Sequence, residues 1–319
     1  TESVEASAGK TGSTTAPAHT LYEIVRKLPD GAQVELESSS DGASLVIRAG
    51  RSRFTLQCLP PADFPAMNEG DLPHRFQLPA TDLKGIIDRT RFAISNEETR
   101  YYLNGIYFHA ATAGGTQVLR GVATDGHRLA RVEVPLPKGA GDIPGVIVPR
   151  KTVGEVRKLL DESDGSVEVE LSDTRIRFAS GNVTLVSKLI DGTFPDYERV
   201  IPTGNDKILN VPCKEFAHAV DRVSTISTEK SRAIKVAVAK GVVTLSATSP
   251  DAGSATEEIE VDYKAAPIEI GFNSRYLLDI TEQIAGAEAR FLMADAGSPT
   301  LVRDGADESA LYVLMPMRV

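Results

Sequence analysis

Cysteine and tryptophan are scarce in this 319-residue sequence, which has two cysteines and no tryptophan. Two cysteines are too few for a disulfide framework or a cysteine-based metal site, so we expect Cys58 and Cys213 to be reduced and packed among apolar neighbours. No run approaches about 18 consecutive apolar residues, and no apolar run follows a basic start, so we expect neither a membrane span nor a signal peptide. These absences predict a protein of the cytoplasm.

The common motifs of hydrolases and nucleotide-binding enzymes are also absent. There is no G-x-S-x-G and no H-E-x-x-H pattern, and the Gly-Lys-Thr at 9–11 lacks the glycine that a phosphate-binding loop requires at position 4, which is Val4. Asp125 and His127 in "ATDGHRLA" (123–130) could act as a base and its orienting partner, so an enzyme stays open as an alternative. We favour a bend between two antiparallel strands, with Gly126 at the turn and Asp125 bracing it.

Composition and charge are those of a globular protein with an acidic average. Hydrophobic residues make up 41% of the chain, charged residues 25%, and the formal net charge is −9. The length predicts two or three domains. An acidic average argues against nucleic-acid binding unless positive charge is segregated onto one face.

Two different half-units alternate along the chain. One, half-unit B, begins at Pro17 ("PAHTLYEIVRKLPDG") and again at Pro149 ("PRKTVGEVRKLLDESDG"); both copies end in Phe-Pro, and a looser copy starts near Phe272. The other, half-unit A, begins at Leu78 ("LPATDLKGIIDR") and again at Val211 ("VPCKEFAHAVDR"). The sequence therefore has the order B, A-B, A-B.

Each half-unit predicts one amphipathic helix and several antiparallel strands. Apolar residues recur at helical spacing in 21–28, 83–87 and 216–223, whereas 167–171, 175–178 and 234–238 alternate as half-buried strands do. Two half-units can bury their helices together over their sheets, which predicts an α+β fold with A-B domains of about 120 residues.

This repeat also predicts the domain boundaries. We expect the C-terminal half of a first, incomplete domain at 1–73, a second domain at 74–202 and a third at 203–319. By the same logic, about half a domain is expected to precede Thr1.

Basic residues return at equivalent places on the polar faces of the expected helices, while acidic residues gather in loops and strands. If the repeated domains are arranged around an axis, these helices face it together and pool their charge. Such an arrangement suits a polyanion that is held through its phosphates without sequence readout.

Several motifs together resemble the beta subunit of bacterial DNA polymerase III, the sliding clamp. They are "RYYLNG" (100–105), "ATDGHRLA" (123–130), "SKLIDGTFPDYERVIP" (187–202), "EIGFNSRYLLD" (269–279) and the terminal "YVLMPMRV". The resemblance covers nearly the whole chain. It implies the DNA clamp fold, a head-to-tail homodimeric ring of similar subdomains that encircles duplex DNA, with helices lining the hole. A closed ring stays on DNA by topology, so the family's role as a non-catalytic processivity subunit needs no catalytic group, cofactor or metal.

The resemblance also implies which residues meet DNA and the second subunit. The expected DNA-binding residues, taken from the helix faces and the family's DNA-proximal loop, are Arg26, Lys84, Arg89, Arg100, Tyr101, Tyr102, Arg150, Lys151 and Arg157. The dimer interface would join an edge strand of the first domain to the third domain, and its expected residues are Arg51, Arg53, Phe54, Leu56, Thr225, Ile226, Glu257 and Glu258.

The family binds its partners through a groove between the second and third domains that accepts a short extended peptide. Its expected partners are the polymerase alpha subunit, the clamp loader, other DNA polymerases and repair proteins. The expected groove residues are Leu103, Thr124, Gly126, His127, Arg128, Leu129, Pro195, Arg199, Val200, Asn273, Tyr276, Pro299, Val313, Leu314, Met315, Pro316, Met317 and Arg318. Methionine-rich apolar walls suit many related peptides. The alternative outside this family is a nucleic-acid-binding scaffold that forms no ring.

Overall fold

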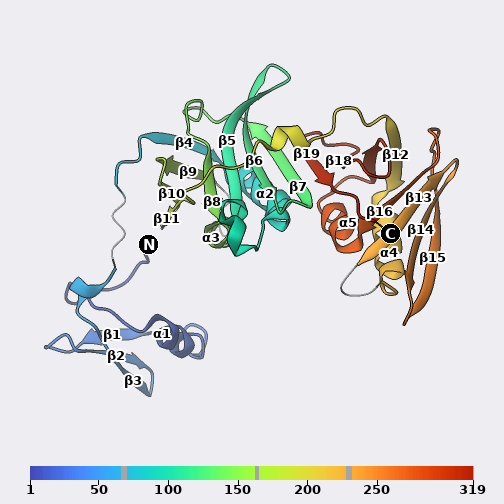
Figure 1. Cartoon of the computed structure of the whole chain (residues 1–319). Coiled ribbons are helices and arrows are strands. Elements are labelled where there is room, and N and C mark those ends of the chain that lie inside the picture. The colour runs from blue at the N-terminus through green and yellow to red at the C-terminus, as the bar shows by residue number, and fades with distance from the viewer. Residues whose placement is uncertain (66–69, 162–164, 228–231, 319) are drawn as a thin grey trace. The chain divides into compact units, whose positions relative to one another are not determined.

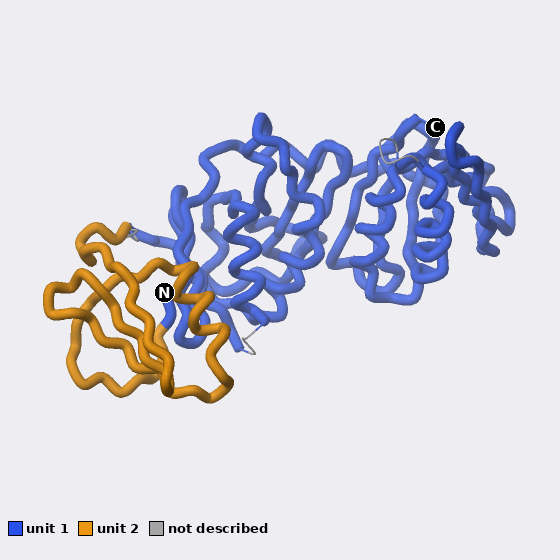
Figure 2. Tube along the Cα trace, turned by 90° about the horizontal axis from the view of Figure 1, so that it is seen from below, with its two compact units in different colours: residues 1–2, 69–319 blue, residues 3–68 orange. Residues whose placement is uncertain are grey.

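The computed structural model describes residues 1–65, 70–161, 165–227 and 232–318. The chain divides into a small unit, residues 3–68, and a large unit, residues 1–2 and 69–319 (Figure 2). Across the described ranges, no helix combines the length and apolar character needed to cross a membrane.

The small unit is a helix with one antiparallel sheet of order β1-β2-β3. Its elements are α1 (Ala18–Val25), β1 (Glu35–Ser38), β2 (Ser44–Ala49), β3 (Ser52–Gln57) and the 3-10 turn η1 (Pro61–Asp63). Leu45, Ile47 and Ala49 of β2 are buried, whereas α1 has no buried residue. In α1, Leu21 and Ile24 are half-buried, whereas Tyr22 is 62% exposed.

The large unit repeats one order of elements, a short strand, a helix and then three antiparallel strands, in each of its half-units (Figure 1). The first two half-units contain β4 (His74–Pro79), α2 (Ala80–Thr90), β5 (Gly105–Ala113), β6 (Thr116–Thr124), β7 (Arg128–Pro135), then β8 (Val146–Pro149), α3 (Arg150–Asp161), β9 (Ser166–Leu171), β10 (Arg175–Ser180) and β11 (Val183–Lys188). The 3-10 turns η2 (Arg91–Ala93), η3 (Glu98–Leu103) and η4 (Tyr197–Val200) belong to the connections.

The last two half-units repeat this order. They contain β12 (Lys207–Pro212), α4 (Cys213–Ser224), β13 (Ala233–Ala239), β14 (Val242–Ser249), β15 (Gly253–Glu260), then β16 (Ile268–Asn273), α5 (Ser274–Thr281), β17 (Glu288–Met293), β18 (Thr300–Asp304) and β19 (Ala310–Leu314). The α+β class predicted from the sequence is confirmed, and each of these four half-units contains the predicted helix and antiparallel strands.

Paired half-units exchange their first strands. The strand β4 of one half-unit pairs with β9 of the next, and β8 of that half-unit pairs back with β5. In the same way β12 pairs with β17, and β16 pairs with β13. Each half-unit therefore completes the sheet of its neighbour.

One sheet runs through both pairs of half-units. Its order is β12-β17-β18-β19-β7-β6-β5-β8, and its central link is the antiparallel ladder between β19 and β7. Main-chain hydrogen bonds thus join segments about 180 residues apart, since Val313 lies opposite Leu129.

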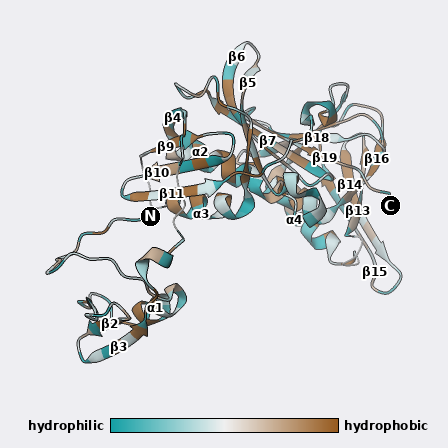
Figure 3. Cartoon of the chain, turned by 60° about the vertical axis from the view of Figure 1, so that its left-hand side comes forward, coloured by the Kyte–Doolittle hydropathy of each residue, from teal (hydrophilic) through white to brown (hydrophobic). Residues whose placement is uncertain are grey.

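The helices pack in pairs, α2 with α3 and α4 with α5, and their apolar sides cover the sheets. In α2 the buried residues include Leu83, Ile86 and Ile87, and in α4 they include Phe216 and Val220, as the apolar spacing predicts. Hydrophobic and hydrophilic residues alternate along many of the strands (Figure 3). The main core of the large unit therefore lies between the helices and one face of the sheets.

Both cysteines are free thiols: Cys213 is buried at the start of α4 and Cys58 is half-buried. Burial raises the pKa of the Cys213 thiol, which keeps it in the protonated form. Cys213 is packed in the hydrophobic core, as expected, whereas Cys58 is only half-buried.

Candidate functional site

The residues 123–130 form a tight bend between β6 and β7, as the sequence predicts. The Asp125 carboxylate accepts hydrogen bonds from the backbone N–H groups of His127 and Arg128, at 2.9 and 3.0 Å. Thr124 donates from its hydroxyl to the Arg128 carbonyl at 2.7 Å, and Gly126 has a positive φ of 88°. Asp125 is therefore occupied in holding the turn together, as expected.

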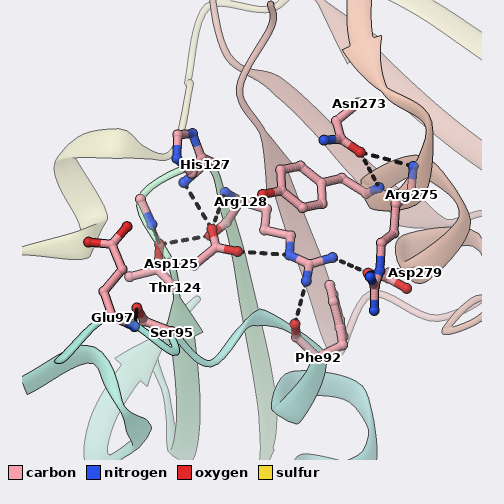
Figure 4. Close-up of polar contacts among 12 residues, drawn as sticks. Phe92, Ser95, Glu97, Thr124, Asp125, His127, Arg128, Asn273, Arg275 and Asp279 are labelled. Carbon is pink, nitrogen blue, oxygen red and sulfur yellow. Dashed lines mark hydrogen bonds and ion pairs between the residues drawn. The ribbon is translucent and has the colours of Figure 1, made fainter. Parts of the chain in front are cut away.

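Arg128 joins this bend to α5 (Figure 4). Its guanidinium donates to Asp125 at 3.1 Å, to the Phe92 carbonyl at 2.6 Å and to Asp279 of α5. The same group lies 4.3 Å from the centre of the Tyr276 ring and 5.0 Å from that of Phe92. Arg128 is only 9% exposed, so its main role in this arrangement is to fix the bend against the neighbouring half-unit.

The segment after β19 runs beside the bend. The backbone N–H of Met315 donates to the His127 carbonyl at 2.9 Å, and that of Met317 donates to the Gly271 carbonyl at 2.8 Å. The His127 ring also stacks near Tyr276, with centroids 6.3 Å apart. The C-terminal methionines are thus held by main-chain hydrogen bonds.

A pocket of about 290 Å³ opens where the bend, η3, η4 and the end of β19 meet. Most of its walls are apolar or aromatic, with charged groups at Arg100, Arg128 and Asp196. The expected groove residues that line it are Leu103, Thr124, Gly126, Arg128, Leu129, Pro195, Val200, Val313 and Met315. An apolar concavity with a few polar groups is the usual form of a site for a small ligand or a short peptide.

The other expected groove residues do not line this pocket. Asn273 caps α5 by accepting from the N–H of Arg275 at 3.0 Å, and Pro299 offers its carbonyl to Asn205 at 2.9 Å. Leu314 is fully buried, while Arg199 is 84% exposed at its side chain and pairs with Asp196 at 2.7 Å. The remaining members of this group are His127, Tyr276, Pro316, Met317 and Arg318.

Some pocket residues were not expected there. Tyr197 and Asp196 of the 187–202 motif line the pocket, and so do Arg100 and Tyr102, which the resemblance places at DNA. Arg100 pairs with Glu97 at 2.6 Å, and its guanidinium lies over Gly126. The aromatic residue within "FPDYERV" was the available sequence signal for Tyr197, because an apolar groove gains most from aromatic walls.

Several expected DNA-binding cations are already paired within the large unit. Lys84 contacts Asp161 at 2.9 Å, and Arg157 contacts Asp88 at 2.6 Å. Hydrogen bonds from Arg157 and Lys84 lower the pKa of the Asp161 carboxyl to about 2. Arg89 donates to Asp307 at 2.8 Å and to Ser309 at 3.0 Å. These contacts tie α2 to α3 and to the segment before β19.

The expected DNA-binding residues Arg26, Tyr101, Arg150 and Lys151 are exposed. Arg150 and Lys151 are exposed at the start of α3, and within the described ranges neither forms an ion pair. Tyr101 is 53% exposed and contacts the edge of the Tyr102 ring. In the small unit, Arg26 ends α1 and pairs with Glu23 at 2.8 Å.

Five of the eight expected dimer residues belong to strands that end their sheets. In the small unit, β3 is the last strand of β1-β2-β3; Arg53 is exposed on it, and Phe54 and Leu56 are half-buried, with Arg51 in the preceding turn. In the large unit, β15 is the last strand of β15-β14-β13-β16 and contains Glu257 and Glu258.

At the β15 edge, Glu257 is engaged by Arg222 of α4, and this contact lowers the pKa of the Glu257 carboxyl. Glu258 is exposed. Thr225 follows α4 and donates to the Arg222 carbonyl at 2.8 Å, next to the half-buried Ile226. Open strand edges are ready to pair with another chain.

Within the described residues, no cluster of three or more His, Cys, Asp or Glu side chains is arranged to hold a metal ion. The large unit offers surfaces that can bind a partner: an apolar pocket, an open strand edge and exposed basic side chains.

Comparison with known proteins gives matches along nearly the whole chain. Models of the DNA polymerase III beta subunit match in order: its N-terminal domain at residues 1–68, its central domain at 77–196 and its C-terminal domain at 198–318. The chain is similar to the beta sliding clamp of Caulobacter vibrioides, with 58% identity over 308 residues that cover 97% of this chain and 83% of that protein.

Solved structures give the same result. The chain is similar to the DnaN sliding clamp of Bartonella birtlesii bound to griselimycin, with a TM-score of 0.96, 52% identity and coverage of 100% of this chain and 85% of that one. It is also similar to the C. crescentus beta sliding clamp with polyethylene glycol bound at the region assigned to beta-motif tethering, with a TM-score of 0.93, 57% identity and coverage of 96% and 81%.

Proposed function

This chain belongs to the DNA polymerase III beta subunit family, the bacterial sliding clamps, and from that membership we propose that it forms a homodimeric ring that encircles duplex DNA and tethers the replicative polymerase. The family's subunit is a non-catalytic processivity factor. Its work is mechanical, because a closed ring cannot leave a long duplex sideways, while weak phosphate contacts let it slide.

The pocket at the 123–130 bend is the observation that carries the tethering role. Its apolar walls Leu103, Leu129, Val313 and Met315 suit the side chains of a short extended peptide, and Arg100, paired with Glu97, lies at its edge. We propose that the polymerase alpha subunit, the clamp loader, other DNA polymerases and repair proteins each insert such a peptide here. The other expected groove residues, including His127, Tyr276 and the segment 316–318, would extend the site beyond the pocket.

Ring closure would use the two open strand edges. We propose that β3 of one subunit meets β15 of the other, so that Phe54 and Leu56 pack against Ile226 while Arg51 and Arg53 approach Glu257 and Glu258. The opposite charges at these edges support this pairing. The three domains of each subunit would be 1–73, 74–202 and 203–319, in keeping with the three family matches.

Contact with DNA would come mainly from the exposed basic side chains. Arg150 and Lys151 are the clearest candidates because they are exposed at the start of α3, and Tyr101 could stack on a base or sugar. Lys84, Arg89 and Arg157 would act through the positive field of the helix layer, since each is already paired. We propose that the protein works in the cytoplasm, at the nucleoid, where the chromosome is.

The test of the ring is retention on DNA of two topologies. The full-length protein is loaded by its clamp loader onto a nicked circular plasmid, and the bound fraction is followed by gel filtration before and after one restriction cut. We expect the protein to stay on the circle and to leave after linearisation. Equal retention on both forms would contradict the topological mechanism.

The test of the pocket is binding of a fluorescent peptide that carries the clamp-binding segment of the polymerase alpha subunit. We expect Leu129→Ala, Met315→Ala and Val313→Ala to weaken binding, because each removes part of an apolar wall. The matched control is Ile208→Ala, an exposed apolar residue of β12 that does not line the pocket. Unchanged affinity in all three wall variants would exclude the pocket.

A further inference from the structure

A row of polar side chains crosses the eight-stranded sheet beneath η4. His109 of β5 lies opposite Arg120 of β6, and Arg120 lies opposite Glu133 of β7. Side chains alternate between the two faces of a strand, and the next residue of β6, Gly121, faces Ile86 of α2. The row therefore lies on the sheet face that α2 does not cover.

Arg120 has partners for its charge although it is only 6% exposed. Its Nε donates to Glu133 at 2.6 Å, and one terminal nitrogen donates both to the Tyr197 hydroxyl at 3.0 Å and to Glu198. His109 Nε2 lies 3.0 Å from the same hydroxyl. A buried guanidinium with this many partners fixes the positions of the groups around it.

The partner segment 194–200 is also held by rings. Phe194 stacks on Tyr107 of β5, with centroids 4.9 Å apart and planes 6° from parallel. Phe194 and Tyr197 are buried in a small hydrophobic cluster together with the pocket residues Leu103, Leu129 and Val313. The segment thus has two attachments, a ring stack at Phe194 and a polar anchor at Tyr197.

This segment builds one wall of the pocket. Pro195, Asp196, Tyr197 and Val200 line it, whereas Arg120 and His109 do not. The position of this wall relative to Leu129 and Val313 sets the width of the pocket. The Tyr197 anchor therefore connects the sheet to the pocket opening.

We propose that Arg120 is a positioning residue for peptide binding, which acts through the Tyr197 hydroxyl and does not touch the peptide. This inference rests on the proposed function of the pocket. With Arg120 in place, the wall formed by η4 is held in its binding position before the peptide arrives. Without it, the wall keeps the Phe194 stack and the His109 contact to the Tyr197 hydroxyl but loses its charged anchor, and a peptide must order the loosened wall at the cost of affinity.

The first experiment measures the binding of the fluorescent alpha-subunit peptide to Arg120→Gln, Tyr197→Phe and the double variant. We expect each single change to weaken affinity by about tenfold, since each frees the wall that the peptide must then order. The double variant should bind about as weakly as either single one, because both remove the same connection. Tyr197→Phe keeps the ring and removes only the hydroxyl, so it tests the proposal even if Arg120→Gln fails to fold.

Arg177→Gln is the matched control. Arg177 pairs with two carboxylates, Glu168 and Glu170, in the sheet of β9 and β10, and it does not line the pocket. A loss of stability alone would affect both arginine variants, whereas the positioning role predicts weaker peptide binding only for Arg120→Gln. Arg120→Lys, which keeps the charge, should recover part of the affinity.

Amide hydrogen exchange in the peptide-free protein gives a second readout. We expect the amides of 196–201 to exchange faster in Arg120→Gln and Tyr197→Phe than in the wild type, with no change in β18. Affinities within twofold of wild type, additive effects in the double variant, or unchanged exchange would each overturn the proposal. If the wild type does not bind the peptide, the proposed function of the pocket fails, and the exchange measurement still decides the anchoring role of Arg120.

Discussion

The guanidinium of Arg128 lies 4.3 Å from the centre of the Tyr276 ring, and the two residues come from β7 and α5. The charge of Arg128 is shared with Asp125 and Asp279. One side chain thus fixes the bend that forms the pocket and also joins two half-units of the large unit.

Replacement of Arg128 by alanine should therefore affect both stability and binding. Removing one partner of a buried charge network leaves the others uncompensated, so we expect the free energy of unfolding to fall by about 3 kcal/mol. Peptide affinity should fall as well. Urea denaturation and the peptide titration measure the two effects. The control is Lys235→Ala, which removes a surface ion pair with Glu269 and should leave both quantities unchanged.

Gly126 should not accept a side chain. Its φ of 88° is strained for other residues, and an added Cβ would lie 2.7 Å from Arg100 Nη1. We expect Gly126→Ala to lower the free energy of unfolding by about 1 to 2 kcal/mol and to weaken peptide binding. Gly141→Ala is the control, because nothing lies within 4 Å of its added Cβ and its φ is not positive. Equal stability of the two variants would contradict the expected strain.

The proposed dimer can be tested by exchange of charges between the two strand edges. Arg53→Glu and Glu258→Arg each place like charges together if β3 meets β15, so each should weaken the homodimer in analytical ultracentrifugation. The double variant restores opposite charges and should recover part of the dimer affinity. If the double variant dimerises no better than the worse single variant, these two residues do not face each other.

The His109 imidazole predicts a pH dependence of stability. Burial lowers the pKa of His109 below its ordinary value, and Arg120 and Arg131 lower it further, against opposing contributions from the Ala110 carbonyl and Glu198. Above the ordinary histidine pKa of about 6.5, the His109 imidazole is neutral in both the folded and the unfolded chain, and its contribution to stability is fully present. As the pH falls below that value, the unfolded chain takes up the proton first, so stability is lost until the folded pKa has been passed.

We expect the urea midpoint of the wild type to fall between pH 7.5 and pH 5.5 by more than that of His109→Gln, which cannot take up this proton. Glutamine can still hydrogen-bond the Tyr197 hydroxyl, so the comparison isolates the titration. Identical slopes in the two proteins would show that His109 does not contribute to the pH dependence.

The repeats made most of the fold predictable, because helix and strand periods are local properties of the sequence. The apolar spacing around Leu83 and Phe216 identified helices that the structure contains. The exchange of first strands was not predicted, since nothing in the four residues of β8 indicates that they pair with β5 and not with β9. Strand partners depend on contacts across the whole domain.

The candidate site was predictable to a similar extent. The motifs indicated the bend and the apolar tail, and half of the expected groove residues line the pocket. Arg100 and Tyr102 were expected only at DNA, because a sequence does not show which way a side chain turns out of a short 3-10 segment. The buried Arg120 was not expected at all, since an arginine in a strand is usually a surface residue.

The ladder between β19 and β7 has a consequence for how such proteins diverge. It holds two half-domain sheets together by main-chain groups, and these are the same whatever the side chains are. Substitutions that keep the strand register leave this main-chain link between the two pairs of half-units in place. Side chains of the pocket wall such as Val313 and Leu129 can therefore change while the main-chain junction between the two pairs of half-units is kept.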